Sequence, residues 1–289
     1  MYKPLKPATT FSTQVSFLVT KGIIIPSASD CESFLSRTNY YRLKGYLLPF
    51  VDRSTGKCRS SIPIDQVVGI YNFDIEIRNL LAQTIEKIEI YLRTQFSYYH
   101  AHQYGPEGYM DAVNFNSHHN HVAFTGHIHR CINDNIRTPV IQHHITNYGN
   151  HFPIWVMVDF FSLGELSYFY TGMKNRDKAA LAMNLYGLNY QTLSSWLKCL
   201  ADLRNRCAHY SRLYYWKFPS IPRTPIGKPF VSDQTLFSQI YMLKYLYPEH
   251  SKWITDFVKP LSTLMKRYRS SISRAHIGFP YRWRSMLSK

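Results

Sequence analysis

Residues 65–102 constrain the fold most strongly, because apolar side chains recur there at close to a helical period. A spacing of about 3.6 residues places such side chains on one face of an amphipathic helix. The apolar positions are Ile70, Phe73, Ile77, Leu80, Leu81, Ile85, Ile88, Leu92, Phe96 and Tyr99. On the polar face, Glu89 and Arg93 form a stabilising pair four residues apart. The pattern ends at Tyr104-Gly105-Pro106, so one long helix is predicted.

Shorter segments also have helical spacing, at residues 11–19, 29–35, 154–170 and 190–209. Gly22 closes the first of these as a C-cap, and Ser29 or Asp30 is the predicted N-cap of the second. Gly164 is either a close packing point or a break in the third. Residues 218–230 form a proline-rich connection to a last helical region. Because the middle of the chain has no strand alternation, we predict a mainly α-helical bundle.

The positive charge is concentrated in the last third of the chain. The net charge is +16, and residues 201–289 hold 16 Lys and Arg against 4 Asp and Glu, a net +12. Such an excess is typical of a phosphate-binding surface. The 23 Tyr and 17 Phe include potential stacking platforms for unpaired bases as well as core residues. Nucleic acid is therefore the preferred partner, although an anionic membrane or an acidic protein also fits the charge.

Other features of the composition limit the compartment and the cofactors. The five cysteines form no CxxC pair, which argues against a zinc ribbon and a disulfide-stapled secreted domain. The N-terminal residues lack the apolar stretch of a signal peptide, and Asp159 and Glu165 interrupt the most apolar window. We therefore expect a protein of a reducing cytoplasm, without a membrane span.

Residues 114–151 contain eight of the thirteen histidines, including the spacing His118-x-x-His121. Metal ligation is one interpretation. However, no Cys or carboxylate set of familiar metal-site spacing accompanies these histidines. Solvated or core histidines are favoured, and we expect no metal and no cofactor.

The segment Arg204-Asn205-Arg206-Cys207-Ala208-His209-Tyr210, at the end of a predicted helix, carries the clearest chemistry. Asn205 and His209 are four residues apart and therefore share a helix face. The fork of an arginine such as Arg204 suits a phosphate, and an imidazole suits proton transfer near neutral pH. RNA carries its own nucleophile, the 2′-hydroxyl, beside each phosphodiester. These groups together point to a ribonuclease.

Structural explanations of this cluster stay open. His209 can instead cap the C-terminus of the helix, where cations are favoured. Arg206 lies four residues after Asp202, so these two side chains can pair along the helix.

Two segments resemble the hallmarks of the Abi-like family of bacterial abortive-infection proteins (AbiD/AbiF type). They are Asn-Tyr-Tyr-Arg-Leu-Lys-Gly-Tyr at 39–46 and the cluster at 204–210. The resemblance covers about residues 11–216, in family order. Further matching segments lie at 71–78, 86–94, 104–106, 153–155 and 162–164.

This family is similar to the HEPN superfamily of helical ribonucleases, whose signature is Arg-x4-6-His. The resemblance implies a metal-independent RNase whose site is often composed across a homodimer. Relatives restrict phage by cleaving RNA, and a structured non-coding RNA holds some of them in check. The signature maps to Arg204 and His209, with Asn205 as the polar companion. Arg93 and His100 match the same spacing as a possible second motif, for which structural use is favoured.

We predict three parts: an N-terminal helical region at 1–62, a HEPN-like core at 63–217, and a basic region at 218–289 packed on that core. The leading hypothesis is an endoribonuclease of an abortive-infection or toxin–antitoxin system, acting on RNA as a homodimer. A catalytically silent HEPN-like protein that complexes a structured or guide-like RNA is the alternative. The predicted RNA contacts are Arg42, Lys44, Arg206, Lys266, Arg267, Arg269, Arg282 and Arg284, with Arg274 also in the basic region. For Arg42 and Lys44, packing against the core is an equally supported role.

Overall fold

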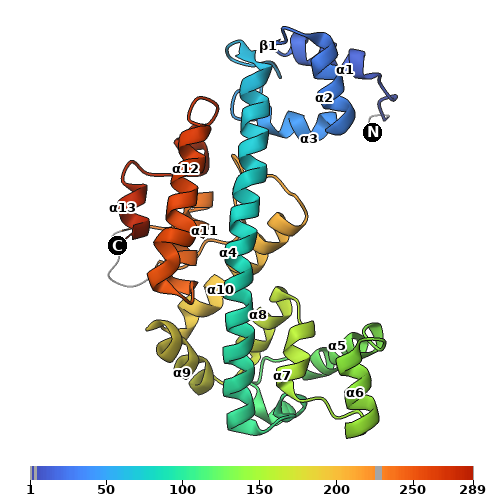
Figure 1. Cartoon of the computed structure of the whole chain (residues 1–289), viewed down its shortest axis with the longest axis vertical. Coiled ribbons are helices and arrows are strands. Elements are labelled where there is room, and N and C mark those ends of the chain that lie inside the picture. The colour runs from blue at the N-terminus through green and yellow to red at the C-terminus, as the bar shows by residue number, and fades with distance from the viewer. Residues whose placement is uncertain (1, 3–4, 225–229, 289) are drawn as a thin grey trace.

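Helix α4 (Ile64–Tyr104) is the axis of the molecule and runs along nearly its whole length (Figure 1). The computed structural model describes residues 2, 5–224 and 230–288 and is mainly helical. At 1.5 Å per residue, α4 is about 60 Å long. The helix follows Pro63 and ends at Gly105, whose φ is +81°. Most of the predicted apolar face is buried, so the prediction of one long helix is confirmed.

Three helices form the N-terminal end: α1 (Phe11–Thr20), α2 (Ala28–Arg37) and α3 (Tyr40–Lys44). A two-stranded parallel sheet joins this end to the start of α4, through β1 (Ile23–Ile24) and β2 (Ile62–Pro63). Helix α1 ends beside Gly22, as predicted, at a φ of +91°. The N-cap of α2 is Ser27, whose hydroxyl accepts from the Asp30 amide at 3.3 Å, so the prediction of Ser29 or Asp30 is wrong.

The opposite end and the middle of the molecule are built from α5 to α10 (Figure 1). Their bounds are α5 (His121–Asp134), α6 (Pro139–Tyr148), α7 (Ile154–Met157), α8 (Leu163–Gly172), α9 (Asn175–Tyr186) and α10 (Tyr190–Ala208). The single helix predicted over 154–170 is wrong. Ser162 begins α8 with a capping box to Glu165, which breaks the predicted helix two residues before Gly164. Helix α10 packs against both α8 and α4, and this contact brings its last turn to the axis.

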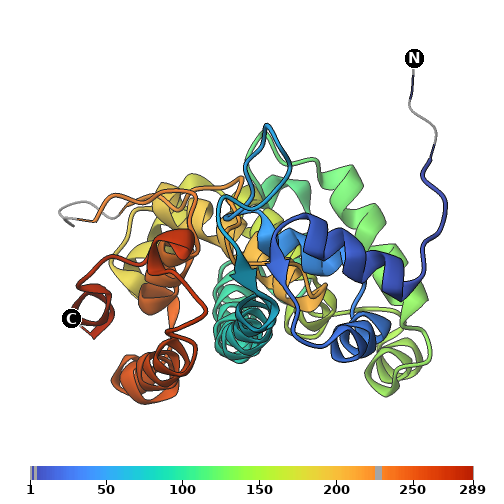
Figure 2. The same ribbon diagram turned by 90° about the horizontal axis from the view of Figure 1, so that it is seen from above.

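The C-terminal helices lie along one side of α4, as the view along that helix shows (Figure 2). They are α11 (Leu236–Leu246), α12 (Lys259–Arg267) and α13 (Trp283–Ser288), with a π-helical turn at Ile254–Val258. Helix α12 packs on α4, and α11 packs on α10. In the predicted proline-rich connection, residues 218–224 have no regular secondary structure and 225–229 lie outside the described residues.

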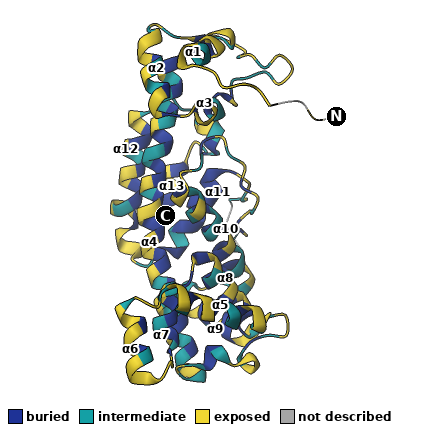
Figure 3. Cartoon of the chain, turned by 90° about the vertical axis from the view of Figure 1, so that its right-hand side faces the viewer, coloured by how far each residue is buried: buried dark blue, intermediate teal, exposed yellow. Residues whose placement is uncertain are grey.

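Buried residues face inward along the whole axis, whereas exposed residues cover the outer faces of the helices (Figure 3). Short 3-10 turns connect several helices, at Gly45–Leu47, Gly108–Met110, Ala112–Asn114, Val158–Phe160, His250–Lys252 and Arg274–Ile277. The core therefore continues from the N-terminal helices through α4 to the C-terminal helices.

Gly278 of the C-terminal segment packs closely against Thr235, at the start of α11. Its φ is +76°, and a Cβ there would lie 1.9 Å from Thr235 Oγ1 and 2.3 Å from Thr235 Cβ. We expect Gly278→Ala to lower the free energy of unfolding by about 1–2 kcal/mol for the left-handed backbone and by roughly 1–3 kcal/mol more for the overpacking. Urea denaturation measures this loss. Gly56→Ala is the control, because Gly56 has a φ of +68° but open space around it. Equal losses in the two variants would contradict the packing explanation.

Candidate active site

The last turn of α10 presents the predicted catalytic residues on the protein surface. Asn189 caps the start of this helix, and a buried apolar stripe that includes Leu200 and Leu203 fixes which face turns outward. His209 follows Ala208 as the C-cap, and its backbone N–H donates to the Asn205 carbonyl at 2.9 Å. Asn205 and His209 are exposed. The structure therefore confirms that these two residues lie at one helix end, one turn apart.

The side chains of Asn205 and His209 are free to meet a ligand. Within the described part of the chain, neither side chain makes a hydrogen bond or an ion pair. His209 also stands at a helix C-terminus, where the partial negative charge of the helix favours a cation. An exposed imidazole in this position can accept or donate a proton.

The Arg204 guanidinium is held from the side by a carboxylate of α4. Arg204 Nε lies 3.6 Å from Glu89 Oε2, and the Arg204 side chain is 40% exposed. The other oxygen of Glu89 pairs with Arg93, which also donates to the carbonyls of Val158 at 2.7 Å and Asp159 at 2.8 Å. A chain of polar contacts therefore runs from the backbone after α7 to Arg204. The sequence indicates only the Glu89–Arg93 pair, because the link to Arg204 depends on how α4 and α10 pack.

The chain reverses its direction directly after His209. Tyr210 has a φ of +53°, and the Ser211 amide donates to the Arg206 carbonyl at 2.9 Å. This left-handed residue ends α10 and sends residues 211–215 toward α4.

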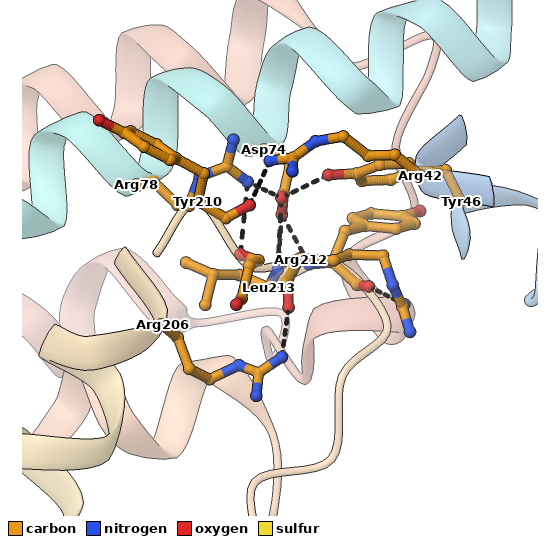
Figure 4. A network of polar contacts seen from close by, with 10 residues as sticks. Arg42, Tyr46, Asp74, Arg78, Arg206, Tyr210, Arg212 and Leu213 are labelled. Carbon is orange, nitrogen blue, oxygen red and sulfur yellow. Dashed lines mark hydrogen bonds and ion pairs between the residues drawn. The ribbon is translucent and has the colours of Figure 1, made fainter. Parts of the chain in front are cut away.

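A buried carboxylate on α4, Asp74, fixes this returning loop (Figure 4). Its oxygens accept from the amides of Leu213 at 3.0 Å and Tyr214 at 2.7 Å, from the Tyr46 hydroxyl at 2.8 Å, and from Arg78. Each of these neighbours donates a hydrogen bond to the Asp74 carboxylate. Together they therefore stabilise its ionised form, which only accepts hydrogen bonds. Burial raises the pKa of Asp74, whereas Arg78 and the hydrogen-bond donors act to lower it.

The segment 39–46 contributes Arg42 and Tyr46 to this network (Figure 4). Arg206 and Arg212 also belong to the network. Asn39 caps α3 by accepting from the Tyr41 amide at 2.8 Å, and Arg42 donates to the Tyr210 carbonyl. A Cβ on Gly45 would lie 3.3 Å from Arg212 Nε, so glycine permits the close approach. Segments 39–46, 71–78 and 204–210 therefore meet in space, although they are far apart in the sequence.

The sequence model of the family described as Abi-like protein matches residues 33–215. The chain belongs to this Abi-like family. The matched range contains all three segments of the Asp74 network and the whole Arg204-to-His209 cluster. Family membership points to a role in abortive infection. No curated protein and no solved structure matches this Abi-like chain.

Arg206 of this Abi-like protein turns inward. Its guanidinium carbon lies 3.7 Å from the centre of the Trp216 ring, and Nη2 donates to the Arg212 carbonyl at 3.1 Å. Burial lowers the pKa of Arg206, and the nearby charge of Asp202 opposes that decrease. The structure thus supports a packing role, with Asp202 as an electrostatic neighbour, and does not favour the predicted RNA contact.

The possible second motif does not form a surface site. Arg93 contributes to the anchoring of Arg204, as described above. His100 is fully buried, and its ring packs against Tyr104, Phe115 and Phe169. Burial lowers the pKa of His100 to about 4. A buried neutral imidazole cannot contact an RNA strand. The structure therefore favours a structural role for His100 and contradicts the use of Arg93 and His100 as a second catalytic motif.

The basic residues of the C-terminal region are mostly exposed and lie on or near α12 and α13. Lys266, Arg269, Arg274 and Arg284 line a pocket of about 290 Å³ beside Trp283. Arg267 is instead engaged by Glu76 of α4, at 2.5 Å. Arg282 is exposed at the start of α13. Lys44, on α3, lies with its Nζ 5.7 Å from the centre of the Tyr41 ring. The RNA contacts of these residues stay predictions.

The histidine-rich region consists mainly of helices packed at one end of the molecule. Its His119 ring stacks on Phe115 at 4.2 Å, and burial lowers the pKa of His119 to about 4. Among the described residues, no group of three or more His, Cys, Asp or Glu side chains is arranged around a common metal position. No helix in the described ranges is both long and apolar enough to cross a membrane.

Proposed function

We propose that this Abi-like protein is a metal-independent endoribonuclease of the HEPN type, which acts in abortive infection by cleaving RNA in the bacterial cytoplasm. The observation that supports this proposal most directly is the surface of the last α10 turn. There, His209 and Asn205 are exposed beside an arginine whose guanidinium is oriented by Glu89.

Each step of the proposed reaction has a matching group. The His209 imidazole takes the proton of the 2′-hydroxyl, and the 2′-oxygen forms a bond to phosphorus. The bond from phosphorus to the 5′-oxygen breaks, and the leaving oxygen takes up a proton from an acid. Arg204 offsets the negative charge that develops on the phosphate oxygens, because its guanidinium donates parallel hydrogen bonds. Asn205 bonds the phosphate or orients the imidazole. The products are a 2′,3′-cyclic phosphate and a 5′-hydroxyl.

A homodimer is part of this proposal. The reaction uses a base and an acid, and each chain contributes one His209. Two copies whose α10 ends face one phosphate would supply both proton-transfer groups. The exposure of His209 and Asn205 leaves that surface open to such a partner.

The test is the incubation of purified full-length protein with end-labelled RNA in EDTA. We expect fragments that carry 2′,3′-cyclic phosphate and 5′-hydroxyl ends. Fragments with 3′-hydroxyl ends, or cleavage that EDTA abolishes, would overturn the metal-independent mechanism. Tight RNA binding without cleavage would instead establish the silent RNA-binding alternative.

Glu89 is expected to act as a positioning residue for Arg204. In Glu89→Gln, Arg204 loses its lateral anchor, whereas Arg93 keeps the carbonyls of Val158 and Asp159. We expect kcat for RNA cleavage to fall by about tenfold, since misplacement of a catalytic group by about 1 Å can cost as much as 10²-fold. RNA affinity should be unchanged or higher, because a negative charge is lost. Single-turnover cleavage and binding titrations measure the two quantities.

Glu86→Gln is the matched control, because Glu86 is an exposed glutamate of the same helix. It removes the same charge without touching Arg204. A Glu89→Gln enzyme with normal kcat, or one with weaker binding alone, would contradict the positioning role.

A further inference from the structure

A groove at the N-terminal end of the molecule is separate from the α10 surface. It lies among α1, α2 and α3 and has a volume of about 1060 Å³. Ligand pockets typically measure roughly 300–1,000 Å³, so this space can hold several linked chemical groups. Its walls combine charged and aromatic side chains, including Lys6, Phe11, Phe17, Lys21, Arg37, Tyr40, Tyr41 and Lys44.

The charge of the groove has one sign. Lys6, Lys21, Arg37 and Lys44 line it, and no Asp or Glu is among the described residues of its lining. Lys21 is held in place, since its Nζ donates to the Gly56 carbonyl at 3.0 Å. Four cations without a carboxylate favour an anionic occupant that carries several charges.

Aromatic rings are interleaved with these cations. Tyr41 is 69% exposed, and Phe11 and Phe17 are 45% and 43% exposed. The Tyr40 ring contacts both Tyr41, at 5.6 Å between ring centres, and Phe17, at 6.4 Å. Exposed rings beside cations are the arrangement on which unpaired bases stack while their phosphates are neutralised.

The groove is connected to the α10 surface through α3. Tyr41 and Lys44 line the groove, and Arg42 of the same helix donates to the Tyr210 carbonyl, one residue after His209. An RNA strand that runs from the C-terminal end of α10 along α3 therefore reaches the groove over the length of this short helix.

We propose that this groove binds a single-stranded segment of RNA a few nucleotides long, to one side of the scissile phosphate. The proposal rests on the proposed function and adds the substrate class: unpaired RNA. Bases stack on Tyr41 and its neighbouring rings, and Lys6, Lys21, Arg37 and Lys44 meet the phosphates. A duplex does not fit this recognition, because its bases are already stacked on each other.

The experiment measures binding in a protein that does not cleave. Full-length protein with His209→Ala is titrated, by fluorescence anisotropy, against a fluorescein-labelled single-stranded RNA of about 12 nucleotides and against the same sequence as a duplex. Adding Tyr41→Ala is expected to weaken single-strand binding by about tenfold and duplex binding much less. Tyr41→Phe, which keeps the ring, should bind like the parent protein.

Lys44→Gln tests the phosphate contact, with Arg130→Gln, an exposed cation of α5, as the control. The slope of log affinity against log salt should decrease in magnitude by about 0.7 for Lys44→Gln and stay unchanged for Arg130→Gln.

Parent-like binding in both Tyr41→Ala and Lys44→Gln would overturn the groove proposal, whatever the cleavage assay shows. If Tyr41→Ala instead changes the oligomeric state in size-exclusion chromatography while RNA affinity is unaffected, the groove is a protein interface and the proposal fails. Absence of cleavage by the unmodified protein would contradict the proposed function alone.

Discussion

Replacing His209 by alanine is expected to slow RNA cleavage by roughly 10²–10⁴-fold, the usual contribution of general acid–base catalysis. The folded state should be unaffected, because the His209 side chain is exposed and makes no hydrogen bond within the described chain. RNA affinity should also be retained, since residues other than His209 make the predicted phosphate contacts. Single-turnover rates with end-labelled RNA, together with thermal unfolding, measure these expectations.

Arg204 provides the companion test. Arg204→Ala should lower the cleavage rate by roughly 10²–10³-fold, as expected when a preorganised donor to a developing charge is lost. Arg204→Lys keeps the charge but not the planar fork, so it should recover only part of the rate. His129→Ala, at an exposed histidine of α5, is the control for loss of an imidazole. Wild-type rates in both His209→Ala and Arg204→Ala would show that the catalytic residues are elsewhere.

Asp74→Ala is expected to lower the free energy of unfolding by about 3–5 kcal/mol, the cost of removing one partner from a buried ion pair. Arg78, whose side chain is 4% exposed, would be left without its carboxylate. The amides of Leu213 and Tyr214 and the Tyr46 hydroxyl would also lose their acceptor. Urea denaturation monitored by circular dichroism measures the change.

Two comparisons isolate the role of the buried charge. Asp134→Ala, at an exposed carboxylate near the end of α5, should change stability by no more than about 0.5 kcal/mol. In Asp74→Ala, the released loop at 210–215 should also lower the cleavage rate under conditions where the protein is still folded. A loss of less than about 1 kcal/mol would mean that the network does not hold the loop.

The long elements were predictable because their apolar faces are continuous. The helices α4 and α10 each pack one face against the core, and this produces the periodicity seen in residues 65–102 and 190–209. The break between α7 and α8 was not predicted, because the hydrophobic run continues through Phe161, and the Ser162 capping box decides the outcome. The sequence does not predict α5 and α6 either, since histidines obscure the short apolar stripes of these helices.

The positions of the candidate site residues could be predicted where the signal is local. Arg204, Asn205 and His209 lie within six residues, so their joint position at a helix end follows from the sequence alone. Glu89 and Asp74 act across helices, and no local pattern distinguishes a carboxylate that pairs within α4 from one that reaches α10 or its loop. Arg206 shows the converse, because this cation within the Arg204-to-His209 cluster packs against the Trp216 ring instead of facing outward.

The Asp74 network also has a consequence for the order of events during synthesis on the ribosome. Its donors Leu213 and Tyr214 follow Asp74 by 139 and 140 residues. At about 5–20 residues per second, the carboxylate and Arg78 are made many seconds before these amides. A nascent chain therefore cannot complete the loop after His209 until most of its length has been translated. A truncated product that ends between residues 209 and 213 has the candidate site residues but lacks the amides that bind Asp74. The Asp74 network therefore holds the loop after the candidate site only once residue 214 has been translated.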